Sequence, residues 1–210
     1  MFERINNLLN SPRLNANNWE INFLGSIKEQ AKLRGRGLSP TQIDILERIE
    51  NNNTEDVHKE MDRWIDEWDS ERQEVARVVS LYYRYEGFYF TILTSKILDQ
   101  SYVPTAKEYA KLCENKYALK IREEHFKKAK FPVNSFVQVR RTCTANKHYR
   151  EENGGHTRLN DAFAIVIETD ALPVRRASLD AKVYKILPVG SSRPYYVSES
   201  DLKKARKIKK

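Results

Sequence analysis

The sequence predicts an α+β protein: a helical bundle (residues 1–130), then a small β-barrel (residues 131–202) and a basic tail (residues 203–210). Apolar residues recur at helical spacing through the first part and alternate with period two in short segments of the second. The charge changes at the same place. Residues 1–130 hold 21 Lys and Arg against 21 Asp and Glu, whereas residues 131–210 hold 16 against 8, which accounts for the net charge of +8.

The helical part is divided by recognisable helix starts. A helix is expected from Asn17 or Asn18 to about residue 32. Ser39, followed by Pro40 and by a glutamine three residues after the serine, has the pattern of a capping box at the start of the next helix. Thr54 begins a third helix with a strongly acidic outer face. Further helices are expected over 71–85, 88–98, 105–113 and 117–128.

The pattern changes at Phe131-Pro132, where we place the domain boundary. Alternating apolar residues predict strands within 136–140, 163–167, 183–187 and 195–197. A long polar loop, 142–160, and shorter connections at 172–180 and 188–194 separate them. Four or five short strands in about 70 residues favour a barrel.

This last third resembles the SH3-like group of small barrels, which includes KOW and Tudor-type domains. The likeness depends on the opening strand at 136–141, the long first loop, the central pair of strands, and the short closing turn at 198–202. The resemblance implies a binding module rather than an enzyme, because such barrels commonly bind RNA, DNA or peptides. Residues 1–130, with their short capped helices and an abrupt change to a small barrel, resemble uncharacterised proteins of tailed phages.

The basic tail is the strongest functional signal. A local block of cations releases counterions when it meets a phosphate backbone, so it favours a nucleic-acid partner without any pocket. A purely solubilising tail and a tail held against the acidic third helix are the alternatives. The cations are Lys203, Lys204, Arg206, Lys207, Lys209 and Lys210.

Further cations and aromatic residues of the barrel extend this predicted surface. Tyr149 and Tyr195 are the candidates for stacking on bases. The dense aromatic residues at 82–85 and 88–90 are assigned instead to the core of a helical segment. The cations expected to contact phosphate are Arg140, Arg141, Lys147, Arg150, Arg158 and Arg193.

We therefore predict a non-catalytic, largely sequence-independent nucleic-acid-binding accessory protein, with DNA and RNA both open. The alternative is a protein–protein adaptor or virion-associated structural protein, anchored by the helix that carries Trp64 and Trp68. A helix-turn-helix over 18–32 and 40–50 is disfavoured, because its second helix is acidic. A protein partner of the helical domain is also expected.

Metal and enzyme sites are weaker hypotheses. Cys143, His148 and His156 have a loose zinc-like spacing but lack a fourth ligand, so no metal and no cofactor is expected. The remaining hypothesis is a metal-dependent nuclease, whose carboxylates and lysine would come from Asp161, Glu168, Asp170, Asp180 and Lys182.

Cysteine usage and hydropathy predict the compartment. The two cysteines, Cys113 and Cys143, provide no disulfide framework, which is typical of a reducing compartment. The N-terminus lacks the basic and apolar regions of a signal peptide. The apolar stretches are shorter than the about 20 residues that cross a bilayer, so we expect a cytoplasmic protein with no membrane partner.

Overall fold

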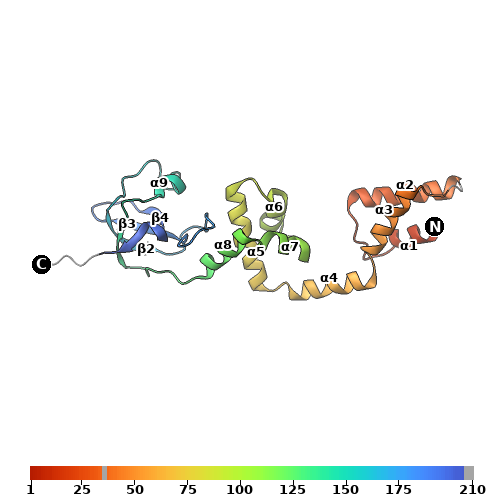
Figure 1. Ribbon diagram of the computed structural model, residues 1–210, viewed down its shortest axis with the longest axis horizontal. Helices are drawn as coiled ribbons and strands as arrows, with labels where there is room; N and C mark the ends of the chain where they lie inside the picture. The colour runs from red at the N-terminus through yellow and green to blue at the C-terminus, as the bar shows by residue number, and fades with distance from the viewer. Residues whose placement is uncertain (35–36, 206–210) are drawn as a thin grey trace. The chain divides into compact units, whose positions relative to one another are not determined.

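In the computed structural model, which describes residues 1–34 and 37–205, the chain folds into two units, Met1–Glu67 and Trp68–Lys210. The first unit is made of helices, and the second has helices followed by a five-stranded antiparallel sheet (Figure 1). The predicted α+β class is confirmed. The domain boundary at 130/131 stays a prediction, whereas the expected start of the tail at 203 lies inside a strand, Leu202–Lys204. Helices give way to strands between α8 (Lys116–Phe126) and β1 (Phe136–Val139).

The first unit contains α1 (Phe2–Leu9), α2 (Asn18–Arg34), α3 (Pro40–Asn51) and α4 (Glu55–Glu67). The expected capping box at the start of α3 is present: the Gln42 N–H donates to the Ser39 hydroxyl, and the Gln42 side chain accepts from the Ser39 N–H. Helix α1 was not anticipated from the sequence. Its Ile5 joins Leu24, Ile27, Leu46 and Ile49 in the core of the unit, so α1 is stabilised by tertiary packing rather than by a strong local start.

The second unit begins with α5 (Ser70–Glu86), α6 (Thr91–Gln100), α7 (Ala106–Cys113) and α8. Gly87 ends α5 in the left-handed conformation, with φ of 75°, where a side chain would be unfavourable. Thr105 begins α7 with a second capping box. Among the described residues, no helix is long and apolar enough to cross a membrane.

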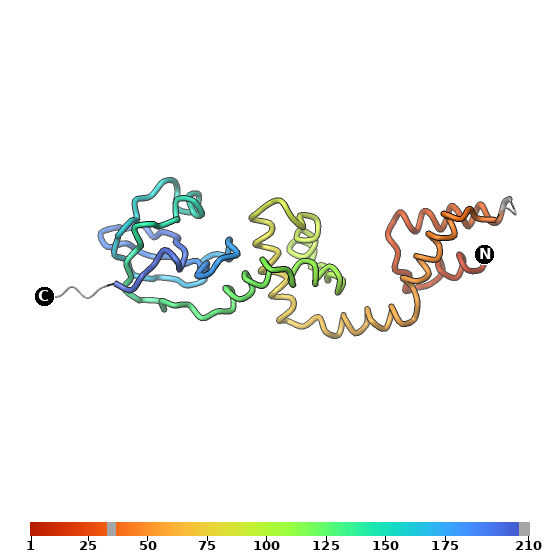
Figure 2. Tube along the Cα trace, in the orientation of Figure 1, coloured from red at the N-terminus to blue at the C-terminus, as the bar shows by residue number. Residues whose placement is uncertain are grey.

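The sheet contains β1, β2 (Phe163–Glu168), β3 (Val183–Pro188), β4 (Tyr195–Ser198) and β5 (Leu202–Lys204), in the order β4-β3-β2-β1-β5. A single 3-10 turn, η1 (Glu199–Asp201), joins β4 to β5. All neighbouring strands are antiparallel. One face of the sheet buries Val137, Val139, Ala164, Val166 and Ile186. Between β1 and β2 the chain leaves the sheet in a long excursion that carries the short helix α9 (Ala145–His148), as Figure 2 shows.

Helix α8 is joined to the sheet region by buried polar contacts. The Glu124 carboxylate accepts the Ala181 N–H at 3.0 Å, and both residues are buried. The Lys182 ammonium donates to the His125 carbonyl at 2.9 Å. Because a buried polar group that loses its partner keeps the full cost of desolvation, these contacts fix α8 on the sheet.

Candidate nucleic-acid interface

The excursion between β1 and β2 is held by side-chain hydrogen bonds to its own backbone and to the closing turn. The Asn146 amide bonds the backbone of Thr157 twice, donating to its carbonyl and accepting from its N–H, each at 2.7 Å. The Asp201 carboxylate, itself buried, accepts the Thr144 N–H at 2.9 Å. The loop that carries five of the twelve predicted cations is thus anchored at the start of α9.

Five predicted phosphate-contacting cations of this excursion are exposed, and within the described residues none of them forms a salt bridge: Arg140, Arg141, Lys147, Arg150 and Arg158. Several arginines of the helical segments are instead ion-paired, such as Arg77 with Glu74 and Arg122 with Glu71. The five cations of the excursion are therefore available to an anionic partner without the loss of a salt bridge.

The cations predicted for the tail divide into two groups. Lys203 and Lys204 lie on β5, paired in register with Gln138 and Val137 of β1, so they belong to the sheet and not to a tail that begins at 203. Lys204 is exposed, and the Lys203 ammonium is 4.0 Å from the Asp161 carboxylate. The other four, Arg206, Lys207, Lys209 and Lys210, lie outside the described residues.

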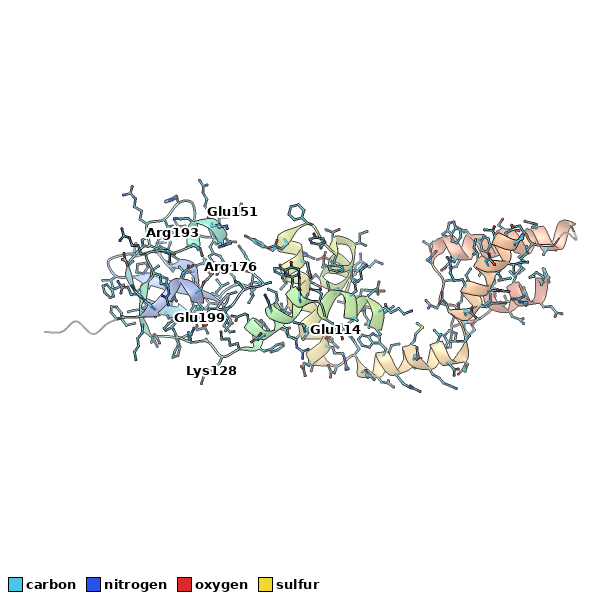
Figure 3. All side chains as sticks on the ribbon, in the orientation of Figure 1. Glu114, Lys128, Glu151, Arg176, Arg193 and Glu199 are labelled. Atoms are coloured by element: carbon cyan, nitrogen blue, oxygen red, sulfur yellow. The ribbon has the colours of Figure 1, made fainter. Side chains whose placement is uncertain are left out.

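Of the two tyrosines predicted to stack on bases, Tyr149 is not available for stacking. Its side chain is fully buried in the sheet core, and its hydroxyl is 2.9 Å from that of Ser198. Because its ring has no exposed surface, Tyr149 cannot stack on a base, and this prediction was wrong. Tyr195 is half-buried, and the Arg193 guanidinium lies 5.7 Å from its ring centroid. Arg193 is exposed and within the described residues forms no salt bridge; Figure 3 labels it on the sheet region.

The exposed cations do not form one cluster. Arg140 follows β1 directly and is tied to the β5 end of the sheet, because its N–H donates to the Asp201 carbonyl and its Nε to the Leu202 carbonyl. Lys147 and Arg150 instead line a pocket of about 410 Å³ between α9 and the end of α5.

The pocket itself is not selective for anions. Lys147, Arg150 and Arg175 line it together with three glutamates, and the Arg175 guanidinium pairs with one of them, Glu152. Burial, followed by the nearby cations Arg176 and Lys147, lowers the pKa of His148, so this histidine adds no charge near neutral pH. Cations and carboxylates balance here, and the pocket carries no charge-based argument for a ligand.

The residues of the nuclease hypothesis are not brought together. Lys182 is buried and pairs with Asp170, while Asp180 contacts two lysines that follow α8, each at 2.7 Å. Glu168 and Asp161 face lysines of β3 and β5 instead. In the part of the chain that the structure describes, no group of three or more His, Cys, Asp or Glu side chains is placed to hold a metal ion.

Sequence reasoning missed two exposed aromatic surfaces. Phe88 and Tyr89, assigned to a helical core, are 85% and 67% exposed at the turn between α5 and α6. On the sheet, Phe136 and Phe163 stack at 5.7 Å between ring centroids and 5° between ring planes, and Phe136 is 49% exposed. The signal for the second was present: residues 163–167 are apolar at every position, so β2 presents apolar side chains on both faces.

Comparison with known proteins adds no family. Family models, curated proteins and solved structures gave no match to this chain.

Proposed function

We propose that the protein is a non-catalytic, largely sequence-independent nucleic-acid-binding protein whose sheet region is an SH3-like barrel. The strand order, in which β1 lies between β2 and β5, and the single 3-10 turn before β5 support the resemblance predicted from the sequence. The observation that carries the function is the set of exposed cations in the β1–β2 excursion that lack an ion-pair partner among the described residues.

The physical basis is the release of counterions. Each cation that contacts a phosphate lowers the slope of log K against log salt concentration by about 0.7 for single strands and 0.9 for duplex DNA. Arg140, Arg141, Lys147, Arg150 and Arg158 need no carboxylate to be displaced before they contact phosphate. Cations that are already paired inside the protein contribute less, because the partner that they lose offsets the gain.

The test is a titration of full-length, nuclease-treated protein with labelled single strands and duplexes at several salt concentrations. Arg141→Gln combined with Arg150→Gln is expected to make the negative salt slope shallower by about 1.4 to 1.8. The matched control is Lys107→Gln with Lys111→Gln, which removes two exposed charges from α7 and is expected to leave the slope near that of the wild type. Equal effects of the two pairs, or no binding at low salt, contradict the proposal.

A second function, protein–protein adaptor or virion component, is favoured by the turn between α5 and α6. Phe88 and Tyr89 of this turn and, at 75% exposure, Ile92 in the first turn of α6 are exposed to solvent, and exposed apolar patches mark interaction sites. Sedimentation velocity of nuclease-treated protein tests it. Self-association supports this function if the double variant Phe88→Ser with Ile92→Ser abolishes it. A protein that stays monomeric at all concentrations contradicts a self-assembling virion component.

A further inference from the structure

The outer face of the sheet is unusually apolar. Alternation along the strands turns Val137, Val139, Ala164 and Val166 toward the core and leaves the residues between them pointing outward. In register, Phe136 of β1 lies opposite Ile165 of β2, which lies opposite Leu187 of β3. An antiparallel sheet that faces water on one side normally carries polar residues there. Here that face has an apolar row across three strands, with Ile165 42% exposed.

The aromatic pair lies within this face. Phe136 and Phe163 are diagonal neighbours on adjacent strands, and their rings are nearly parallel. Each ring covers one side of the other, so the ring sides that point away from the pair are the surfaces open to a planar ligand. Half of the Phe136 side chain is exposed. Two parallel aromatic rings on an open sheet provide a stacking platform of the kind on which unpaired bases bind.

Cations border the platform on the same face. Lys203, Gln138 and Phe163 form one row across β5, β1 and β2, and two strand spacings place Lys203 about 10 Å from Phe163. Arg140 follows the last residue of β1, and the alternation along this strand places it on the same outer face as Phe136 and Gln138; it is exposed. The nearest carboxylate is Asp161, 4.0 Å from the Lys203 ammonium. Glu168, at the end of β2, is 3.7 Å from Lys185.

We propose that this outer face binds single-stranded nucleic acid, with bases stacked on Phe136 and Phe163 and the backbone alongside Lys203 and Arg140. The inference rests on the proposed function and narrows its ligand. A duplex hides the faces of its bases, whereas a single strand offers them. The bordering lysine and arginine favour a polyanion over the apolar helix that a purely aliphatic face would accept.

The test compares oligothymidylate with a duplex of similar length, using the full-length protein and the variants Phe136→Leu and Phe163→Leu. Leucine keeps the apolar volume but removes the aromatic face. Each variant is expected to lose single-strand affinity by about 5- to 100-fold, with no change in duplex affinity or in the salt slope. Phe88→Leu, which alters an exposed aromatic residue outside the sheet, is the control and is expected to bind as the wild type. Phe136→Tyr keeps an aromatic ring and is expected to retain the single-strand affinity of the wild type.

A second measurement covers variants that fail to fold. The wild-type protein is photocrosslinked to a 4-thiothymidine oligonucleotide, and the labelled peptides are mapped by mass spectrometry. Crosslinks within 133–139 or 163–167 support the proposal, and crosslinks confined to 141–160 overturn it. Leucine variants that bind single strands normally overturn it while the proposed function stands. Absence of binding to any nucleic acid contradicts both the single-strand proposal and the proposed function. If the wild-type protein self-associates and Phe136→Leu abolishes this, the outer face is a protein interface and the single-strand proposal is overturned as well.

Discussion

Replacement of Glu199 by alanine is expected to destabilise the sheet region strongly. Glu199 lies in the closing turn η1 and is 1% exposed (Figure 3). Its carboxylate accepts hydrogen bonds from the Tyr184 hydroxyl and from the Lys130 N–H, the latter at 2.9 Å, and the Lys127 ammonium is 3.7 Å away. Burial and the neighbouring carboxylate both raise the pKa of Tyr184, so this tyrosine stays protonated and remains a donor.

The magnitude follows from the groups that are left behind. Glu199→Ala leaves the buried Tyr184 hydroxyl and the part-buried Lys130 N–H without their acceptor, at about 1–3 kcal/mol each. The two losses together give an expected cost of about 2–6 kcal/mol. Tyr184→Phe removes one donor while the carboxylate keeps its other partners, so it is expected to cost about 1 kcal/mol.

Thermal unfolding followed by circular dichroism measures both costs. At about 2–4 °C per kcal/mol for a unit of this size, Glu199→Ala is expected to lower Tm by roughly 10 °C. Glu114→Ala, which removes an exposed carboxylate from the end of α7, is the control and is expected to change little. A Glu199→Ala cost below about 1 kcal/mol, or one equal to the control, refutes the reasoning.

Three further predictions concern other parts of the chain. Burial raises the pKa of Asp180, but hydrogen bonds from Lys127 and Lys130 outweigh it and lower the pKa to about 2. Its ion pairs therefore stabilise the fold above about pH 4 and lose this effect as the pH falls toward 2; the difference in urea midpoint between wild type and Asp180→Asn should shrink over that range. Ser39→Ala removes the α3 capping box and should cost about 1 kcal/mol, seen as faster hydrogen exchange in α3 peptides. Burial, the main cause, raises the pKa of Cys113 to about 12 and that of Cys143 to about 11. Both thiols should react slowly with a disulfide reagent until urea unfolds the chain, and rapid native labelling of Cys113 contradicts its burial.

The elements that the sequence predicted correctly are those with local causes. The capping box at Ser39 forms between residues three apart, so it can be read without knowledge of the fold. The alternation at 136–139 and the apolar run at 163–167 likewise belong to single strands. Helix α1 has no comparable start signal, and it depends on the contact of Ile5 with residues of α2 and α3.

The errors within the candidate site have a tertiary cause. Tyr149 stands among cations in a polar stretch of sequence, and only the approach of Ser198, 49 residues later, places its ring in the core. Lys203 and Lys204 look like the start of a tail until β5 pairs with β1. In both cases a partner distant in the chain decides the environment, and a local pattern contains no information about that partner.

Folding alone does not account for the aromatic outer face. A slip of β1 by one residue would turn Phe136 inward, but it would also expose Val137 and Val139, which are fully buried. The core thus fixes the register and leaves Phe136 outside, where a polar residue would serve the sheet equally well. An exposed phenylalanine gains little from folding and favours aggregation. Its position beside Phe163, with Lys203 and Arg140 bordering the same face, is the arrangement that the proposed single-stranded ligand requires, because that ligand needs aromatic surface and positive charge together.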